Sequence, residues 1–584
     1  SSQAKQPKLA THPAHLVAMI TVGCCECNIG QEHVEIITQT AVITEKDQEN
    51  QEDEDSQEDL SVNEDDSDIK EVHVKMNEET MLARSSLNLA IALGATHPQR
   101  KPSNSELSLS LEDHKLLRGT SICQVLRRVG AELRVNSLSK DFSHEEALQL
   151  YGRSVEVKEI DYFISHCWQD ERFSKTVALL IHSNLWMAIF VSTPVAFSMS
   201  CLTRLKLLPV VEPEEGDLHV FPWALCTGMS IFFLVLCTWH HCRVFFCYLW
   251  HRLSRGDPED GKATIGTTYF LDKFCVHQRD LPLKQQGVRS FAAFVASSKN
   301  LLLLWSPQYF TRLWCTLELA ALVKSKSHLR TLPLTIMPLQ LAKVSLVTWI
   351  VAFFVFALYQ FNKVVGKILP EVGILISGLL LGGYCWSMSL RQYAHDRRAM
   401  HEQIGNFSVQ SAKCSDARDR SWVERSMLRW FADLEQCNQH IRKGLREQIS
   451  DALGPESHFP SSLVFPIFLV NLFSEADYFA AGYYDVITFR RTMGAIGQAA
   501  GTLTLLPASY QLCLCLARKH PQRWIEVLIN CLLALSVTVM AFTFFALNFY
   551  VVGNIELGNW TVGIAVVQVL VAVWFHRVSL RVSR

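Results

Sequence analysis

The side chains best suited to contact a polar ligand follow predicted strands of this chain. Ser165 and His166 begin a polar loop directly after one short apolar run, and Asp272 directly follows another. Such runs alternate with helical segments between about residues 158 and 345, which predicts βα units and therefore a parallel sheet. Ligands of parallel sheets bind at the carboxyl ends of the strands. We therefore expect these three side chains to make polar contacts with a ligand there.

Four short apolar runs are the strands that would position these residues. Their apolar character suits the central strands of a parallel sheet, which are buried on both faces. Helices are predicted at 171–183, within 281–298 and at 311–323, and the last of them carries Glu318. The strands are expected at residues 162–164, 269–271, 301–304 and 332–336.

Three motifs within this segment resemble the signature boxes of a TIR domain. They are Phe-Ile-Ser-His at 163–166, Leu-Asp-Lys at 271–273, and the box at 306–319 that contains Trp-Cys-x-x-Glu. The resemblance implies an α/β, TIR-like fold with a flavodoxin-like parallel sheet. It also implies signalling by self-association or by assembly with other TIR-like domains. Some TIR domains, in addition, cleave NAD between nicotinamide and ribose.

The resemblance also implies which residues would act on NAD. The glutamate of the third box is Glu318, the candidate catalytic residue of an NAD glycohydrolase. Breaking the glycosidic bond develops oxocarbenium character, which a nearby carboxylate can stabilise. NAD would then be a substrate, with no cofactor bound tightly. The candidate NAD pocket comprises Ser165, His166, Trp168, Asp272, Trp305 and Trp314.

Several of these residues also have a purely structural interpretation. Glu318 could pair with Arg312 on its own helix, and scaffold-type TIR domains carry a glutamate in this box as well. His166 could be a hydrogen-bonded structural histidine, and Trp314 could pack in the core. Residues 274–287 depart from the family's usual loop, which commonly governs assembly and access.

Long apolar segments indicate a multi-pass integral membrane protein in contact with a lipid bilayer. Hydrophobic residues make up 49% of the chain, and about eight segments approach the length of a bilayer span. The first two form a hairpin, 185–250, that interrupts the TIR-like domain, so the domain must lie against the membrane. The predicted spans are 185–205, 221–250, 346–361, 368–390, 463–473, 493–516, 524–552 and 560–575.

Basic residues concentrate on one side of the predicted membrane. If all eight segments cross, both halves of the TIR-like domain, the region 391–460 and both termini share that side with the basic loop 517–523. The positive-inside rule then places them in the cytosol. The alternative is a transporter or channel regulated by an embedded TIR-like domain. Against it, the spans hold few charged residues where a permeation path would place them.

The remaining regions complete the predicted organisation. Residues 45–68 are acidic and nearly free of apolar residues, which predicts disorder. In 391–460, apolar residues recur at helical spacing up to Leu453 and predict one helix, packed against either the split domain or a second copy. A net charge of −2 without a basic patch gives no sign of nucleic-acid binding, and no zinc-binding motif occurs. The predicted domains are a largely disordered region (1–115), a lead-in with the first part of the TIR-like domain (118–184), the hairpin (185–250), the second part of the TIR-like domain (256–343), a second hairpin (346–390), a cytosolic helical region (391–460), C-terminal spans (461–576) and a basic tail (577–584).

Overall fold

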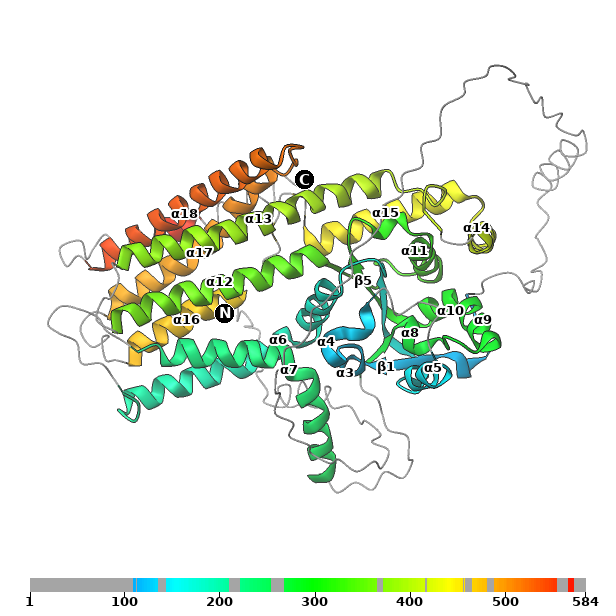
Figure 1. The fold of residues 1–584 in the computed structure, drawn as a ribbon, viewed down its shortest axis with the longest axis horizontal. Coiled ribbons are helices and arrows are strands. Elements are labelled where there is room, and N and C mark those ends of the chain that lie inside the picture. Colours follow the sequence, from blue (N-terminus) through cyan, green and yellow to red (C-terminus); the bar gives the residue numbers. More distant parts are fainter. Residues whose placement is uncertain are drawn as a thin grey trace, which may run out of the picture. The chain divides into compact units, whose positions relative to one another are not determined.

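The structure is a computed structural model, shown in Figure 1. It describes residues 109–571 apart from residue 112 and the segments 135–142, 210–220, 254–266, 365–370, 415–416, 455, 457–458, 460–464, 481–487 and 554–565. The predicted acidic region up to residue 108 and the basic tail 577–584 lie outside the described residues.

A six-stranded sheet contains all four of the predicted strands. Its spatial order is β2-β1-β4-β3-β5-β6. β3 is parallel to both β4 and β5, and β5 is parallel to β6, with Phe163 paired to both Phe270 and Leu301. The strands are β1 (Arg118–Ser121), β2 (Val155–Glu156), β3 (Ile160–His166), β4 (Thr268–Phe270), β5 (Ser298–Trp305) and β6 (Leu334–Pro338).

The predicted parallel pairing is confirmed for the four predicted strands, but the sheet as a whole is mixed, because one side of it is antiparallel. β1 pairs antiparallel with both β2 and β4, which makes the sheet mixed. Both extra strands come from the lead-in, which begins at residue 118. β1 hydrogen-bonds to the free edge of β4, and no local sequence pattern reveals such a pairing between distant segments.

Aromatic and aliphatic side chains fill the core around β3. The rings of Phe163 and Phe270 stack with centroids 4.7 Å apart, and Phe291 meets Phe163 edge to face. Leu301 and the three leucines that follow it on β5 are buried. Together with β1–β6, the following helices make up what we call the sheet domain: α3 (Ile122–Val125), α4 (Arg127–Gly130), α5 (His144–Tyr151), α8 (Asp272–Cys275), α9 (Leu281–Arg289), α10 (Phe291–Ala296) and α11 (Leu313–Ser325).

The described residues also form long helices, several of which are continuous with the sheet domain. The helix predicted after the first strand and the first predicted span are one element, α6, without a break near residue 184. β6 likewise runs directly into α12. The long helices are α6 (Arg172–Arg204), α7 (Trp223–Leu253), α12 (Leu339–Val364), α13 (Glu371–Gly405), α16 (Phe465–Ala480), α17 (Thr488–Cys515) and α18 (Arg523–Gly553).

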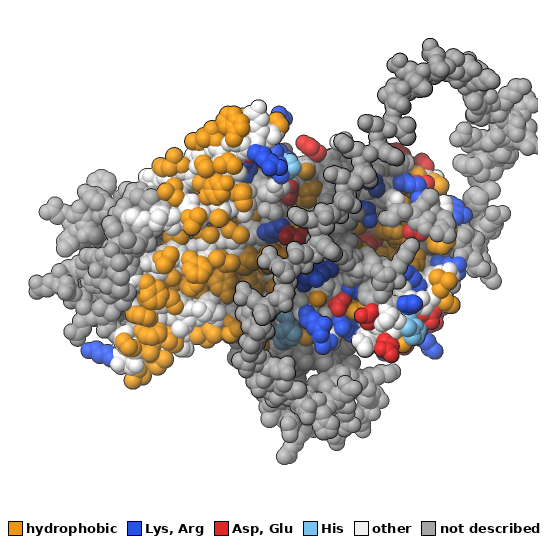
Figure 2. All heavy atoms as spheres, in the orientation of Figure 1, with side chains coloured by type: hydrophobic (Ala, Val, Ile, Leu, Met, Phe, Trp, Pro, Cys, Tyr) orange, Lys and Arg blue, Asp and Glu red, His pale blue; other side chains and the backbone are white. Residues whose placement is uncertain are grey.

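Four of these helices are long and apolar enough to cross a membrane. They are α6, α7 over Trp223–Arg243, α12 over Leu339–Phe361, and α18 over Arg523–Ala541. Three other predicted spans fall on α13, α16 and α17, while the eighth is described only over its helical residues 566–571. Hydrophobic side chains gather on the outer surface of the long helices, and charged side chains gather over the sheet domain (Figure 2).

The region 391–460 holds two helices where one was predicted. α14 (Ala417–Trp430) ends before Asp433, whose side chain accepts a hydrogen bond from Gln436 N (2.6 Å) and caps α15 (Leu434–Leu453). α15 packs on the sheet domain. Gly444 of α15 makes this close packing possible, since a Cβ atom on residue 444 would lie only 2.8 Å from the side chain of Leu332. Of the two predicted packing partners, the structure therefore has the split domain.

Candidate functional site

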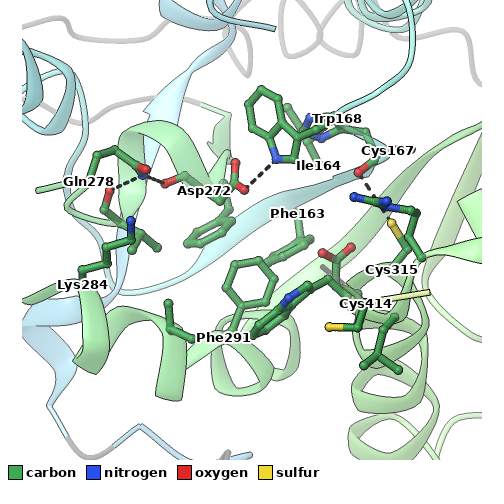
Figure 3. A pocket seen from close by; sticks show the side chains of 18 of the residues that line it. Phe163, Ile164, Cys167, Trp168, Asp272, Gln278, Lys284, Phe291, Cys315 and Cys414 are labelled. Atoms are coloured by element: carbon green, nitrogen blue, oxygen red, sulfur yellow. Dashed lines mark hydrogen bonds between the residues drawn. The ribbon is translucent and has the colours of Figure 1, made fainter. Parts of the chain in front are cut away.

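A cavity of about 330 Å³ lies at the carboxyl ends of β3 and β4 (Figure 3). This volume is at the lower end of the range for small-molecule sites. Phe163, Phe270 and Phe291 form part of its wall, so the cavity is largely apolar with a few polar groups. Five of the predicted site residues line it, namely His166, Trp168, Asp272, Trp314 and Glu318.

Glu318, on α11, is a buried carboxyl group in this cavity. The side chain is 7% exposed, and Ser165 Oγ, at the end of β3, donates a hydrogen bond to Glu318 Oε2. The Ser165 hydroxyl is in turn hydrogen-bonded to the Tyr309 hydroxyl. Burial raises the pKa of Glu318 to about 8, and the neighbouring charge of Asp272 contributes in the same direction. In the ligand-free site, Glu318 is therefore protonated at neutral pH.

Asp272 is the second carboxyl group of the cavity and is held from two sides. Trp168 Nε1 donates to Asp272 Oδ2 (3.0 Å), the bond drawn in Figure 3, and Lys273 N donates to Asp272 Oδ1 (2.7 Å). Burial raises its pKa above the usual range. The Trp168 backbone is fixed as well, because Lys175 Nζ donates to the carbonyls of Cys167 and Trp168 at 3.2 Å each.

His166 contributes an uncharged ring to the cavity. Burial, and secondarily the charge of Lys175, lower its pKa to about 3, so it is neutral at physiological pH and a weak base. Its ring meets that of Trp168 edge to face, with centroids 4.5 Å apart. Among the described residues, none hydrogen-bonds to His166 Nε2. The sequence left open that His166 is a structural histidine held by hydrogen bonds. In the described part of the chain, no side chain holds it at Nε2.

The two other predicted tryptophans differ in position. Trp314 lines the cavity, donates from Nε1 to Asp419 Oδ2 (3.3 Å) and packs against Phe291. Trp305 ends β5 as a buried core residue and is not among the residues that line the cavity.

The ion pair between Glu318 and Arg312 is not found among the described residues. The carboxyl group of Glu318 is bonded to Ser165 instead, and Arg312 itself lines the cavity. Arg312 lies directly before α11 and six residues from Glu318, beyond the spacing of three or four residues at which helical side chains pair. Glu318 is therefore a buried carboxyl group of the cavity and not part of a surface ion pair.

Several residues that line the cavity were not predicted. Gln278 and Lys284 come from the segment that departs from the family pattern, and Figure 3 shows both on the side of Asp272. Lys413 and Cys414 come from the region 391–460, far from the sheet domain in sequence. No motif marked Lys413 or Cys414, since their position depends on a contact between distant segments.

Backbone hydrogen bonds attach this distant segment to the site. Lys413 N donates to Thr311 O (2.6 Å) and Leu313 N donates to Lys413 O (3.0 Å), so Lys413 pairs with Arg312 in a parallel β-bridge. The wall of the cavity opposite Lys284 is thus built by residues that follow α13.

Within the described ranges, no group of three His, Cys, Asp or Glu side chains could hold a metal ion.

Comparisons with known proteins found no match. No protein-family model matches the chain, and neither a curated protein nor a solved structure is similar to it.

Proposed function

We propose that this chain is a multi-pass membrane protein whose sheet domain is TIR-like, lies in the cytosol and acts in signalling. In this proposal the domain cleaves NAD through Glu318 and assembles with further copies or with other TIR-like domains. The observation that carries the enzymatic part is the buried carboxyl group of Glu318 in a cavity with aromatic walls.

The chemistry suits a ligand that becomes positively charged. When the bond between nicotinamide and ribose breaks, its electron pair leaves with nicotinamide and positive charge develops on the ribose. Water then adds to the ribose carbon and releases a proton, so the products are nicotinamide and ADP-ribose. A carboxylate beside the ribose would stabilise this transition state.

The raised pKa of Glu318 fits this role once a ligand is bound. In the empty cavity, protonation of Glu318 avoids a buried negative charge. The charge of Asp272 also disfavours the ionised form of Glu318. The pyridinium of bound NAD is a cation, which favours the ionised carboxylate. The aromatic faces of Trp168 and Trp314 supply flat apolar surfaces for the nicotinamide ring.

The exposed apolar faces of the long helices support the membrane location. On α18 the exposed residues recur at spacings of three and four, which is one helix face, and soluble proteins rarely expose patches of this size. They are Trp524, Val527, Leu528, Leu532, Leu535 and Val539. The distribution of basic residues supports the proposed position of the sheet domain in the cytosol.

Assembly is supported by the surface next to the cavity. Leu281, at the start of α9, is 64% exposed, and Lys284 of the same helix lines the cavity. In TIR domains, the loop at this place commonly governs assembly and access. Contact between copies at α9 would therefore also affect entry to the site.

The experiment is the release of nicotinamide from NAD by the full chain in detergent and in lipid. Glu318→Gln keeps the shape and a polar group for Ser165, and is expected to reduce release by at least about a hundredfold. Glu145→Gln, at an exposed position of α5, is the matched control and should match the unaltered chain. Equal release by Glu318→Gln and the control would overturn the enzymatic proposal.

A further inference from the structure

Three cationic side chains line the cavity without an acidic partner. They are Lys284 of α9, Arg312 directly before α11, and Lys413. Among the described residues, no carboxylate or carbonyl accepts a hydrogen bond from any of these three side chains, and none forms an ion pair. Cations that gather around one cavity repel one another, and a negative group bound between them would relieve this repulsion.

The backbone holds two of these cations together. The β-bridge between Arg312 and Lys413 fixes the two residues side by side, although they lie on segments about a hundred residues apart. Figure 3 shows Lys284 and Cys414, the residue after Lys413, on opposite sides of the cavity, so α9 and the segment after α13 both contribute to its lining. All three cations line this one cavity, so one ligand could be contacted from both segments.

The acidic groups of the cavity lie deeper than the cations. Glu318 and Asp272 are buried and bonded to Ser165 and Trp168, respectively. Lys284 and Lys413 are exposed, and Arg312 is half-buried. The cavity therefore has an acidic interior and a cationic rim, which complements a molecule with one electron-poor end and one strongly anionic part.

We propose that Arg312, Lys413 and Lys284 form an anion subsite that binds the phosphate groups of a nucleotide, while its other end reaches Glu318. The inference rests on the proposed function for the group that meets Glu318, and it adds which residues of this chain would bind the phosphate groups of the same substrate. Arg312 supplies a planar fork for bidentate phosphate contact, and the two lysines supply point charges. The subsite is complete only when the segment after α13 is seated on the sheet domain.

The test is direct binding of ADP-ribose to the full chain in detergent, which needs no turnover. Arg312→Gln should weaken binding by about tenfold to a hundredfold, as expected for a lost charge-assisted hydrogen bond. Lys413→Gln should weaken binding by about threefold to tenfold, since its side chain is exposed. Lys158→Gln, an exposed lysine before the amino end of β3, is the matched control and should leave the affinity unchanged.

Further measurements keep the outcome unambiguous. Arg312→Lys preserves the charge and should recover part of the affinity for ADP-ribose that Arg312→Gln loses. Lys413→Gln alters an exposed side chain that the fold does not need, so its effect on binding is not an effect on folding. Weaker ADP-ribose binding in the cation variants supports the subsite even if no nicotinamide is ever released. Absence of ADP-ribose binding to the unaltered chain, or equal affinities for all variants and the control, would overturn it, even if hydrolysis through Glu318 were established.

Discussion

The sheet domain and the long helices place their apolar side chains in opposite ways. In the sheet domain, Phe163 and Phe270 are buried between strands and helices, and charged groups cover the surface. The long helices expose large apolar residues such as Leu532, and instead bury polar groups between them. The two regions therefore suit different solvents, water for the sheet domain and lipid for the long helices.

Two buried polar side chains of the long helices hydrogen-bond to the backbone of a neighbouring helix. Asn184 Nδ2 donates to Leu236 O (2.8 Å), which links α6 to α7. Asp477 of α16 accepts from Ala224 N (2.6 Å) and Leu225 N (2.9 Å) in the first turn of α7. In lipid, no hydrophobic driving force holds helices together, so such hydrogen bonds contribute specific contacts between them.

The boundary between the two regions runs through helices and not through loops. α6 starts in the loop after β3 and continues as an apolar helix, and α12 continues directly from β6. α13 leads into the segment that carries Lys413. A shift of α6, α12 or α13 along its axis would consequently be transmitted to the cavity, because helices are stiff over these lengths.

The largest expected effect separates the two kinds of apolar residue. Phe163→Ala should lower the free energy of unfolding by about 3–5 kcal/mol, because it leaves a cavity in the sheet core. Phe190→Ala, on the exposed face of α6, should cost about 0.5 kcal/mol or less, since lipid fills the space. Thermal unfolding of both variants in lipid nanodiscs checks this. Similar losses would contradict the assignment of α6 to lipid.

A charge placed on each surface should sharpen the comparison. Leu532→Arg on α18 (54% exposed) is expected to disfavour membrane insertion by about 2.5–3.5 kcal/mol. Leu148→Arg on α5 (48% exposed) should change stability by about 0.5 kcal/mol or less, because water already surrounds it. The inserted fraction after alkaline extraction of membranes reports the difference. Tolerance of both substitutions would show that this face of α18 does not contact lipid.

A smaller effect is expected where polar groups join the long helices. Asn184→Ala removes the bond to Leu236 and should destabilise the packing of α6 on α7 by about 1 kcal/mol. Ser198→Ala on the same helix is the control, because within the described ranges the Ser198 hydroxyl bonds to Pro194 O of its own helix (2.8 Å) and to no other helix. The unfolding midpoint in detergent checks this pair. Equal midpoints would mean that the bond adds nothing to the packing.

The last expected effect concerns the pH dependence of stability in the sheet domain. The pKa of Glu318 in the folded chain, about 8, exceeds its ordinary value of 4.5, so the folded state holds the proton more tightly. Stability should therefore decrease as pH rises from the ordinary value towards the folded one. Glu318→Gln cannot ionise and should lessen this decrease. Unfolding midpoints across that window, for both chains, provide the measurement, and parallel curves would contradict the burial of a titrating Glu318.

Local patterns in the sequence predicted the central strands and part of the site. The runs around Phe163 and Leu301 are continuous enough to identify buried strands, and strand order brought Ser165 next to Glu318. The antiparallel pairing of β1 depends on a partner edge that no local pattern encodes. Lys413 was missed for the same reason, since only the folded β-bridge brings it to Arg312.

The continuity of α6 was also beyond local patterns. A polar first half and an apolar second half suggest two elements, although residues such as Asn184 are compatible with an uninterrupted helix. Helices end at capping residues and at helix-breaking residues. A change from polar to apolar surroundings along a helix needs neither, so it does not mark a helix end in the sequence.

Glu318 carries the proposed reaction, and the rate of nicotinamide release between about pH 6 and pH 9 tests this role most directly. For the full chain in lipid nanodiscs, the rate should rise with pH as Glu318 becomes ionised, with a midpoint at or below about 8 when bound NAD favours the carboxylate. Glu318→Gln should show no release at any pH in this range. Release by that variant at the rate of the unaltered chain, with the same pH profile, would contradict the account.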